Sequence, residues 1–133
     1  MSNKYFPAND GSADELWDVV HDLPAGISDA FHLVAASLGQ ADAAAALRDA
    51  LGQVRATSTR AHLPRVASYE ILPLSLRLAG FLRRHDGWRR EALAALAAAA
   101  TARRVEEGRG ALLVAADAIE RGVTEVESRA SAA

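Results

Sequence analysis

The sequence predicts an all-α fold, a compact bundle of five to six helices in which a long C-terminal helical hairpin is one option. Alanine, leucine, arginine and glutamate are strong helix formers and are abundant, whereas aromatic residues make up only 5% of the chain. Apolar residues recur in steps of three and four along most of the sequence, which is the spacing of one helix face. The 133 residues are enough to bury one core without disulfides or metals.

A single domain is expected over residues 11–128, after a flexible lead-in over residues 1–10 and before a frayed tail over residues 129–133. Residues 66–82 are the most apolar run of this domain, and they carry only two charges, Glu70 and Arg77. A helix that is apolar on all sides must be covered on most of them. We therefore predict this segment at the centre of the bundle.

Three helices are predicted in the first half of the chain. Ser12 and Glu15 have the spacing of a capping box, which indicates a first helix from residue 12 to about Leu23. Pro24 ends that helix, and a second is expected to begin shortly after it and to reach Leu38. A third helix is predicted over residues 41–61, because its apolar residues alternate in steps of three and four.

Two prolines determine the prediction for the middle of the chain. Pro64 fits the first turn of a helix, whereas a proline at position 73 removes a backbone donor and clashes with the preceding turn. We expect one helix over residues 64–71, a break or kink at Pro73, and another helix over residues 73–84.

The last third of the chain leaves two topologies open. An alanine-rich helix is expected from residue 88 to about residue 107, where Gly108 and Gly110 interrupt it. A turn at these glycines gives an antiparallel hairpin, whereas an unbroken helix needs a second chain to cover it. After the glycines, apolar residues in steps of four and three predict a seam for self-association. The seam consists of Leu112, Ala116, Ile119, Val123 and Val126.

The net charge of −2 is distributed unevenly along the chain. Residues 1–42 carry a charge of −6, residues 43–104 carry +7, and residues 105–133 carry −3. We expect the acidic ends to pair with the basic middle, within one chain or across a dimer. The near-neutral total argues against a nucleic-acid partner, which requires a basic face without acidic neighbours.

Composition and motifs exclude several chemistries. The absence of cysteine excludes disulfides, thiolate metal sites and cysteine nucleophiles. The sequence lacks a nucleophile elbow and a glycine-rich phosphate loop, so it indicates neither an enzyme nor a cofactor. No apolar run reaches the roughly 20 residues of a membrane span, and the first residues lack a secretion signal. A cytoplasmic protein is expected.

Two Asp-x-x-His pairs form a candidate metal site, Asp18 with His21 and Asp29 with His32. A spacing of three places a carboxylate and an imidazole on one helix face, as do the Glu-x-x-His pairs of carboxylate-bridged dimetal bundles. A simpler interpretation places Asp18 on a solvated acidic face and Asp29 in a helix first turn, where its charge is favourable.

Residues 83–90 predict a turn that is rich in arginine. Guanidinium groups beside an indole suit an acidic protein, an anion or single-stranded nucleic acid. A simpler interpretation is that the arginines complement a helix C-terminus while the indole covers the core. The residues concerned are Arg83, Arg84, Trp88, Arg89 and Arg90.

The function that these observations favour is a non-catalytic protein–protein interaction module, with a regulatory, adaptor or structural role. Its partner is expected to be a second copy or another protein. One alternative is a bundle that binds a metal at the Asp-x-x-His pairs, or a small apolar ligand near Tyr69, Leu72 and Phe81. The other alternative is anion or nucleic-acid binding at the arginine-rich turn.

Overall fold

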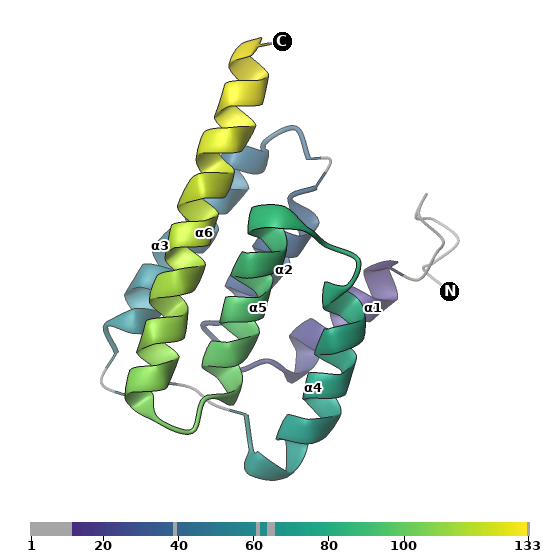
Figure 1. Cartoon of the computed structure of the whole chain (residues 1–133), viewed down its shortest axis with the longest axis vertical. Helices are drawn as coiled ribbons and strands as arrows, with labels where there is room; N and C mark the ends of the chain where they lie inside the picture. Colours follow the sequence, from purple (N-terminus) through teal and green to yellow (C-terminus); the bar gives the residue numbers. More distant parts are fainter. Residues whose placement is uncertain (1–11, 39, 61, 64–65, 133) are drawn as a thin grey trace.

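The computed structural model of the chain describes residues 12–38, 40–60, 62–63 and 66–132, and this part is built from helices (Figure 1). The prediction of an all-α bundle is therefore confirmed. The lead-in predicted over residues 1–10 lies outside the described residues, and the predicted frayed tail is helical as far as Ala132. The described helices are α1 (Ser12–Asp22), α2 (Ser28–Ala36), α3 (Ala43–Ser58), α4 (Ser68–Leu82), α5 (Gly87–Thr101) and α6 (Val105–Ala132).

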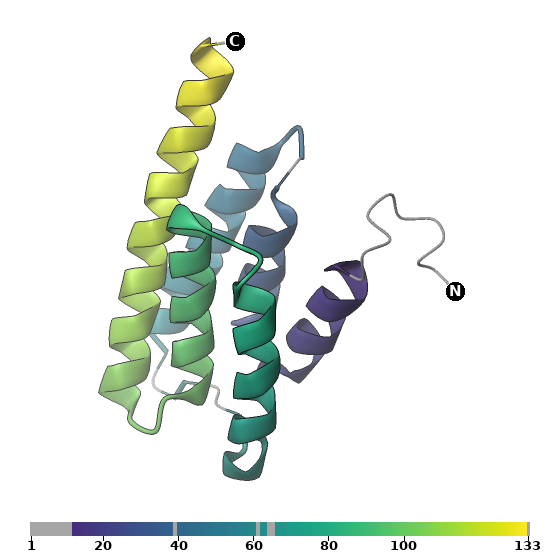
Figure 2. The same cartoon turned by 45° about the vertical axis from the view of Figure 1, so that its right-hand side comes forward.

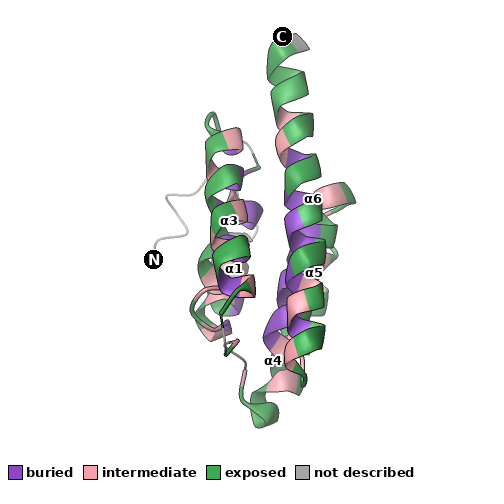
Figure 3. Ribbon diagram, turned by 90° about the vertical axis from the view of Figure 1, so that its left-hand side faces the viewer, coloured by how far each residue is buried: buried purple, intermediate pink, exposed green. Residues whose placement is uncertain are grey.

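The helices of the described part are arranged in two layers, as the side view in Figure 3 shows. One layer contains α1, α2 and α3, and the other contains α4, α5 and α6, with neighbours in sequence packed side by side. Across the layers, α1 packs on α4, α2 on α5, and α3 on α6. The core therefore lies between the layers, and exposed residues occupy the outer faces.

Helix α5 lies in the middle of its layer, between α4 and α6 (Figures 1 and 2). Alanine side chains are small, so the neighbouring helices approach α5 closely and fill the core with their own larger side chains. Seven of its 15 residues are buried: Ala92, Leu93, Ala95, Leu96, Ala97, Ala99 and Ala100. The alanine run is thus an internal helix of the fold.

The prediction that residues 66–82 occupy the centre of the bundle is wrong. Helix α4 lies at one edge of its layer, where it packs against α1 and α5 only on one side (Figure 2). Its buried residues are Leu74, Leu78 and Phe81. A highly apolar segment has many side chains that would gain from burial. Which of these side chains are buried depends on how closely the other helices can pack against the segment. The alanines of α5 allow closer packing than the bulky side chains of α4.

The predicted break at Pro73 is also wrong, because α4 is a continuous helix that begins at Ser68. Pro73 is its sixth residue, so the missing N–H leaves only the carbonyl of Tyr69 without its intrahelical partner. Both residues are exposed, so this turn of the helix lies at the surface, where a backbone carbonyl without a partner costs little. The helix begins later than predicted because the backbone of Ala67 is extended, with ψ 142°.

Of the two predicted topologies for the C-terminal helices, the structure shows the hairpin. Its turn, however, does not contain Gly108 or Gly110. Helix α5 ends at Thr101, the backbone of Ala102 is extended, and α6 begins at Val105. Gly108 lies buried inside α6, where an added Cβ would approach Leu63 Cδ1 to 2.8 Å. This glycine therefore permits a close contact and does not form a turn.

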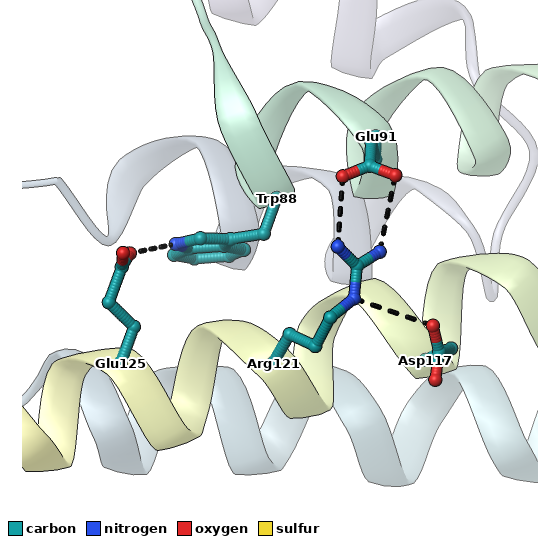
Figure 4. Close-up of polar contacts among 5 residues, drawn as sticks. All are labelled: Trp88, Glu91, Asp117, Arg121 and Glu125. Carbon is teal, nitrogen blue, oxygen red and sulfur yellow. Dashed lines mark hydrogen bonds and ion pairs between the residues drawn. The ribbon is translucent and has the colours of Figure 1, made fainter.

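The start of α5 is positioned by two glycines, Gly87 in the preceding turn and Gly122 in α6. Gly87 has a φ of +59°, which residues with side chains rarely adopt, and it directs the chain into α5. The next residue, Trp88, lies over Gly122, where an added Cβ would be 2.4–2.6 Å from the indole ring. The indole Nε1 donates a hydrogen bond of 2.6 Å to Glu125 Oε2 (Figure 4). The hairpin is thereby closed at the end opposite its turn.

The predicted attraction between the acidic ends and the basic middle is confirmed within the chain. Among the described residues, ion pairs that connect the two layers include those of Arg77 with Asp22, Arg48 with Glu127, and Arg55 with Glu120. Exposed pairs of this kind contribute at most about 1 kcal/mol each. They therefore orient the layers, while the apolar core supplies the stability.

Substitution of Gly122 by alanine is expected to lower the free energy of unfolding by about 1–3 kcal/mol, because the new methyl group displaces Trp88. Gly110→Ala in the same helix is the matched control, since an added Cβ there meets nothing within 4 Å. It should raise stability by about 0.5–1 kcal/mol through helix propensity. Urea unfolding measures both, and equal effects would contradict the role of Gly122.

Candidate functional site

The arginine-rich turn is divided between residues that hold the fold together and residues that face solvent. Arg89 is half-buried, and its Nε and Nη2 donate to Val34 O at 3.3 Å and to Ser37 Oγ at 3.0 Å. Its guanidinium carbon also lies 4.5 Å from the centroid of the Trp88 ring. Arg89 therefore connects α5 to the C-terminal end of α2, where carbonyl groups attract a cation.

Beside this contact, a second arginine connects α5 to α6 on the surface. Arg121 donates two hydrogen bonds to Glu91, of 3.0 and 3.2 Å, and its Nε lies 3.4 Å from Asp117 (Figure 4). The hydrogen bonds from Arg121 lower the pKa of Glu91. The paired geometry is one that guanidinium and carboxylate groups favour. Both carboxylates, those of Glu91 and Asp117, therefore pair with Arg121 and stabilise the contact between α5 and α6.

The other arginines of the turn do not join Arg89. Arg83 and Arg84 line a groove of about 330 Å³ between α1 and α4, which also has apolar walls. Arg90 is exposed on α5. The remaining lining residues of the groove are Asp18, Val19, Leu76, Arg77, Gly80 and Phe81. The structure therefore separates the predicted arginine cluster: Arg89 makes a half-buried contact with α2, Arg83 and Arg84 line a groove, and Arg90 is exposed.

The four residues of the Asp-x-x-His pairs, Asp18, His21, Asp29 and His32, are all exposed on α1 and α2. His21 lies beside Asp22, with 3.4 Å between Nδ1 and Oδ1. In the described part of the chain, no group of three or more histidine, aspartate or glutamate side chains gathers where a metal ion could bind. The metal site stays a prediction.

The residues predicted to line an interior ligand pocket lie on opposite sides of α4. Phe81 is buried in the core, with its ring centroid 5.7 Å from that of Phe31. Tyr69 and Leu72 are 80% and 69% exposed. The structure therefore does not bring these three side chains together around one cavity.

The seam predicted for self-association on α6 lies within the chain. Leu112, Ala116 and Ile119 are buried in the core, and Val123 and Val126 are partly buried against it. Helices α3 and α5 of the same chain pack along α6. A second copy cannot reach Leu112, Ala116 and Ile119 without opening the fold, so these three side chains are not available to a partner.

An exposed apolar stripe lies on the outer face of α4 and was not predicted from the sequence. Tyr69, Leu72 and Leu76 are 80%, 69% and 68% exposed, and Ala79 continues the row. Steps of three, four and three place these four residues, here called the outer stripe, on one helix face. Exposed contiguous apolar patches mark interaction sites more often than isolated exposed side chains do. The signal in the sequence is a second apolar row beside the one that contains Leu74.

Comparison with known proteins gives no information on the function of the chain. No protein-family model, no curated protein and no solved structure matches the chain. No helix of the described residues has the length and apolarity that a membrane crossing requires. The class that the geometry defines is a two-layer helical bundle with an exposed apolar helix face.

Replacement of Arg89 by alanine is expected to destabilise the fold by about 1–3 kcal/mol, because it removes the hydrogen bonds to Val34 and Ser37. Arg90→Ala is the matched control, and as an exposed substitution it should change stability by less than about 0.5 kcal/mol. Thermal unfolding compares the two variants. If they are equally stable, the contact of Arg89 with α2 does not hold the layers together.

The stability of the fold is expected to depend on the protonation of His85, whose ring lies 4.9 Å from that of Phe81. Burial and, to a smaller extent, Arg89 lower the pKa of His85 below its ordinary value of 6.5, and Asp86 opposes this shift. The unfolded chain then binds the proton more readily, so stability falls as the pH decreases through about 6.5.

The free energy of unfolding, measured by urea at about pH 7.5 and pH 5.5, checks the titration of His85. The native protein should lose more stability between the two pH values than the variant His85→Gln, which retains the other titrating groups. Identical losses would show that His85 has the same pKa in the folded and unfolded chain.

Proposed function

We propose that the chain is a non-catalytic helical interaction module that associates with a second copy of itself through the outer stripe of α4. The observation that supports this proposal is that three large apolar side chains, each at least 68% exposed, share one face of α4. The opposite face of the same helix is already part of the core. Helix α4 therefore has two apolar faces, of which the chain itself covers only one, and burial of the other face by a partner would be favourable.

The size of the outer stripe supports a weak association. Covering it removes apolar surface on the order of several hundred Å² per copy from water, and each square ångström contributes roughly 25 cal/mol. This is less than the roughly 800 Å² per partner of a stable complex. We therefore expect a concentration-dependent dimer with a dissociation constant in the micromolar range or weaker.

The state of the polar groups is the second support for a binding role. The described residues for which a pKa shift is resolved, His85, Arg89, Glu91 and Arg121, are engaged in contacts within the fold. Groups with perturbed pKa values that act in catalysis normally face a cleft. Arg89 lines a groove of about 200 Å³, but its guanidinium is held there by Val34 and Ser37 of the fold. A regulatory, adaptor or structural role is consistent with this distribution. A cytoplasmic location is part of the same proposal on the sequence argument alone.

The double variant Leu72→Glu/Leu76→Glu tests this proposal, because two carboxylates prevent the stripe from being covered. The mass of the wild-type protein, measured by light scattering after gel filtration, should rise from monomer to dimer with concentration. The double variant should remain monomeric, with helix content and melting temperature close to the wild type since both residues are exposed.

Leu113→Glu is the matched control, since Leu113 is 64% exposed on α6, outside the stripe. It should dimerise like the wild type. A wild-type protein that stays monomeric at millimolar concentration would reject self-association and leave another protein as the partner. Equal dimerisation of the wild type and of the double variant would move the interface away from α4.

A further inference from the structure

The outer face of α4 carries different groups at its two ends. At 100° per residue, Tyr69, Leu72, Leu76 and Arg83 fall within an arc of about 60°. Arg83 is the C-cap residue and keeps helical angles, with φ −62° and ψ −17°, so it continues the face past the end of the helix. The row therefore begins with an exposed aromatic ring and ends with an exposed cation.

Resting on the proposed self-association, we infer that two copies pair α4 against α4 in antiparallel orientation, around a two-fold axis at Leu76, with Arg83 of each copy over Tyr69 of the other. A two-fold interface is self-complementary, so residues at equal distances on either side of the axis meet. Tyr69 and Arg83 are each seven residues from Leu76. The contact between them is a cation–π pair, and symmetry makes two of them.

The middle of the same row has matching shapes. Leu72 and Gly80 are each four residues from Leu76, so the leucine of one copy lies opposite the glycine of the other. An added Cβ at Gly80 would meet only Arg83 Nη2, at 3.7 Å. Gly80 also lines the groove of about 330 Å³ between α1 and α4. The leucine side chain has space to enter between helices, as ridges enter grooves in packed helices.

The charges of the helix favour the antiparallel orientation. In a parallel pair, Arg83 would face Arg83 and the helix dipoles would be aligned side by side, and both arrangements are repulsive. In the antiparallel pair, the helix dipoles run in opposite directions and the two Arg83 side chains lie at opposite ends of the interface, each near Tyr69 of the other copy. Arg83 forms no ion pair or hydrogen bond with the described residues of its own chain, so its charge is available for this contact.

Cysteine cross-linking tests the register, because the chain contains no cysteine and each introduced thiol is unique. Leu76→Cys lies on the proposed axis, so two copies present their thiols to each other. Two copies of Ala79→Cys place their thiols about 9 Å apart along the helices, and two copies of Leu72→Cys about 12 Å apart. Both separations are too large for a disulfide. In a mixed dimer of Ala79→Cys with Leu72→Cys, however, the two thiols lie within about one residue of each other along the helices.

The expected result under a mild oxidant such as diamide is that Leu76→Cys cross-links to itself. Ala79→Cys and Leu72→Cys should each stay monomeric on a non-reducing gel, and their equimolar mixture should give a cross-linked dimer. Leu113→Cys on α6 is the matched control for random collision. All these positions are exposed or lie on the helix surface, and circular dichroism verifies that each variant keeps its helix content.

The outcomes that overturn the inference differ from those that overturn the proposed function. If Ala79→Cys and Leu72→Cys cross-link to themselves as readily as Leu76→Cys, the helices pair in parallel, and self-association through α4 survives. If the wild type dimerises but no α4 variant cross-links faster than Leu113→Cys, both the register and the α4 interface are wrong. A wild type that is monomeric at millimolar concentration removes the proposed function itself.

Discussion

The close approach of α6 to its neighbours is the constraint on which the fold depends. Gly108 and Gly122 remove side chains at two contacts, against Leu63 and against Trp88, where any Cβ would collide. The alanines of α5 have the same effect along the middle of the layer. Small residues on two adjacent helices allow the backbones to come together, so the larger side chains of the neighbouring helices pack closely against them and gain dispersion contacts.

This packing explains why α4 is left at the edge. Helices α5 and α6 have small residues that permit tight contacts, and they pack on α2 and α3 of the other layer. Helix α4 covers the remaining end of the core with Leu74, Leu78 and Phe81. Its second apolar face, which contains Leu72 and Leu76, then has no helix of the described chain to cover it. The exposed face results from the way the core is completed, and it gives the fold a surface suited to a partner.

The elements that local chemistry controls could be predicted from the sequence, and the site could not. Pro24 marks the end of α1 within two residues, and α5 begins one residue before its predicted start at residue 88. Apolarity singles out Tyr69 and Leu72, but it assigns them to an interior pocket although both are exposed. The same pattern assigns Leu112 and Ile119 to self-association although the chain buries them itself. An apolar row predicts that a face will be covered but does not identify what covers it.

The sequence by itself determined the all-α class, the approximate boundaries of α1, α2 and α3, and the attraction of the acidic ends to the basic middle. These follow from helix propensity, from proline and glycine, and from the order of charges, which act locally or over the whole chain. Only the tertiary structure decided that Gly108 serves a contact and not a turn, and that α4 exposes one apolar face. The physical reason is that coverage depends on the shapes of helices that are distant in sequence, and a single segment does not contain them.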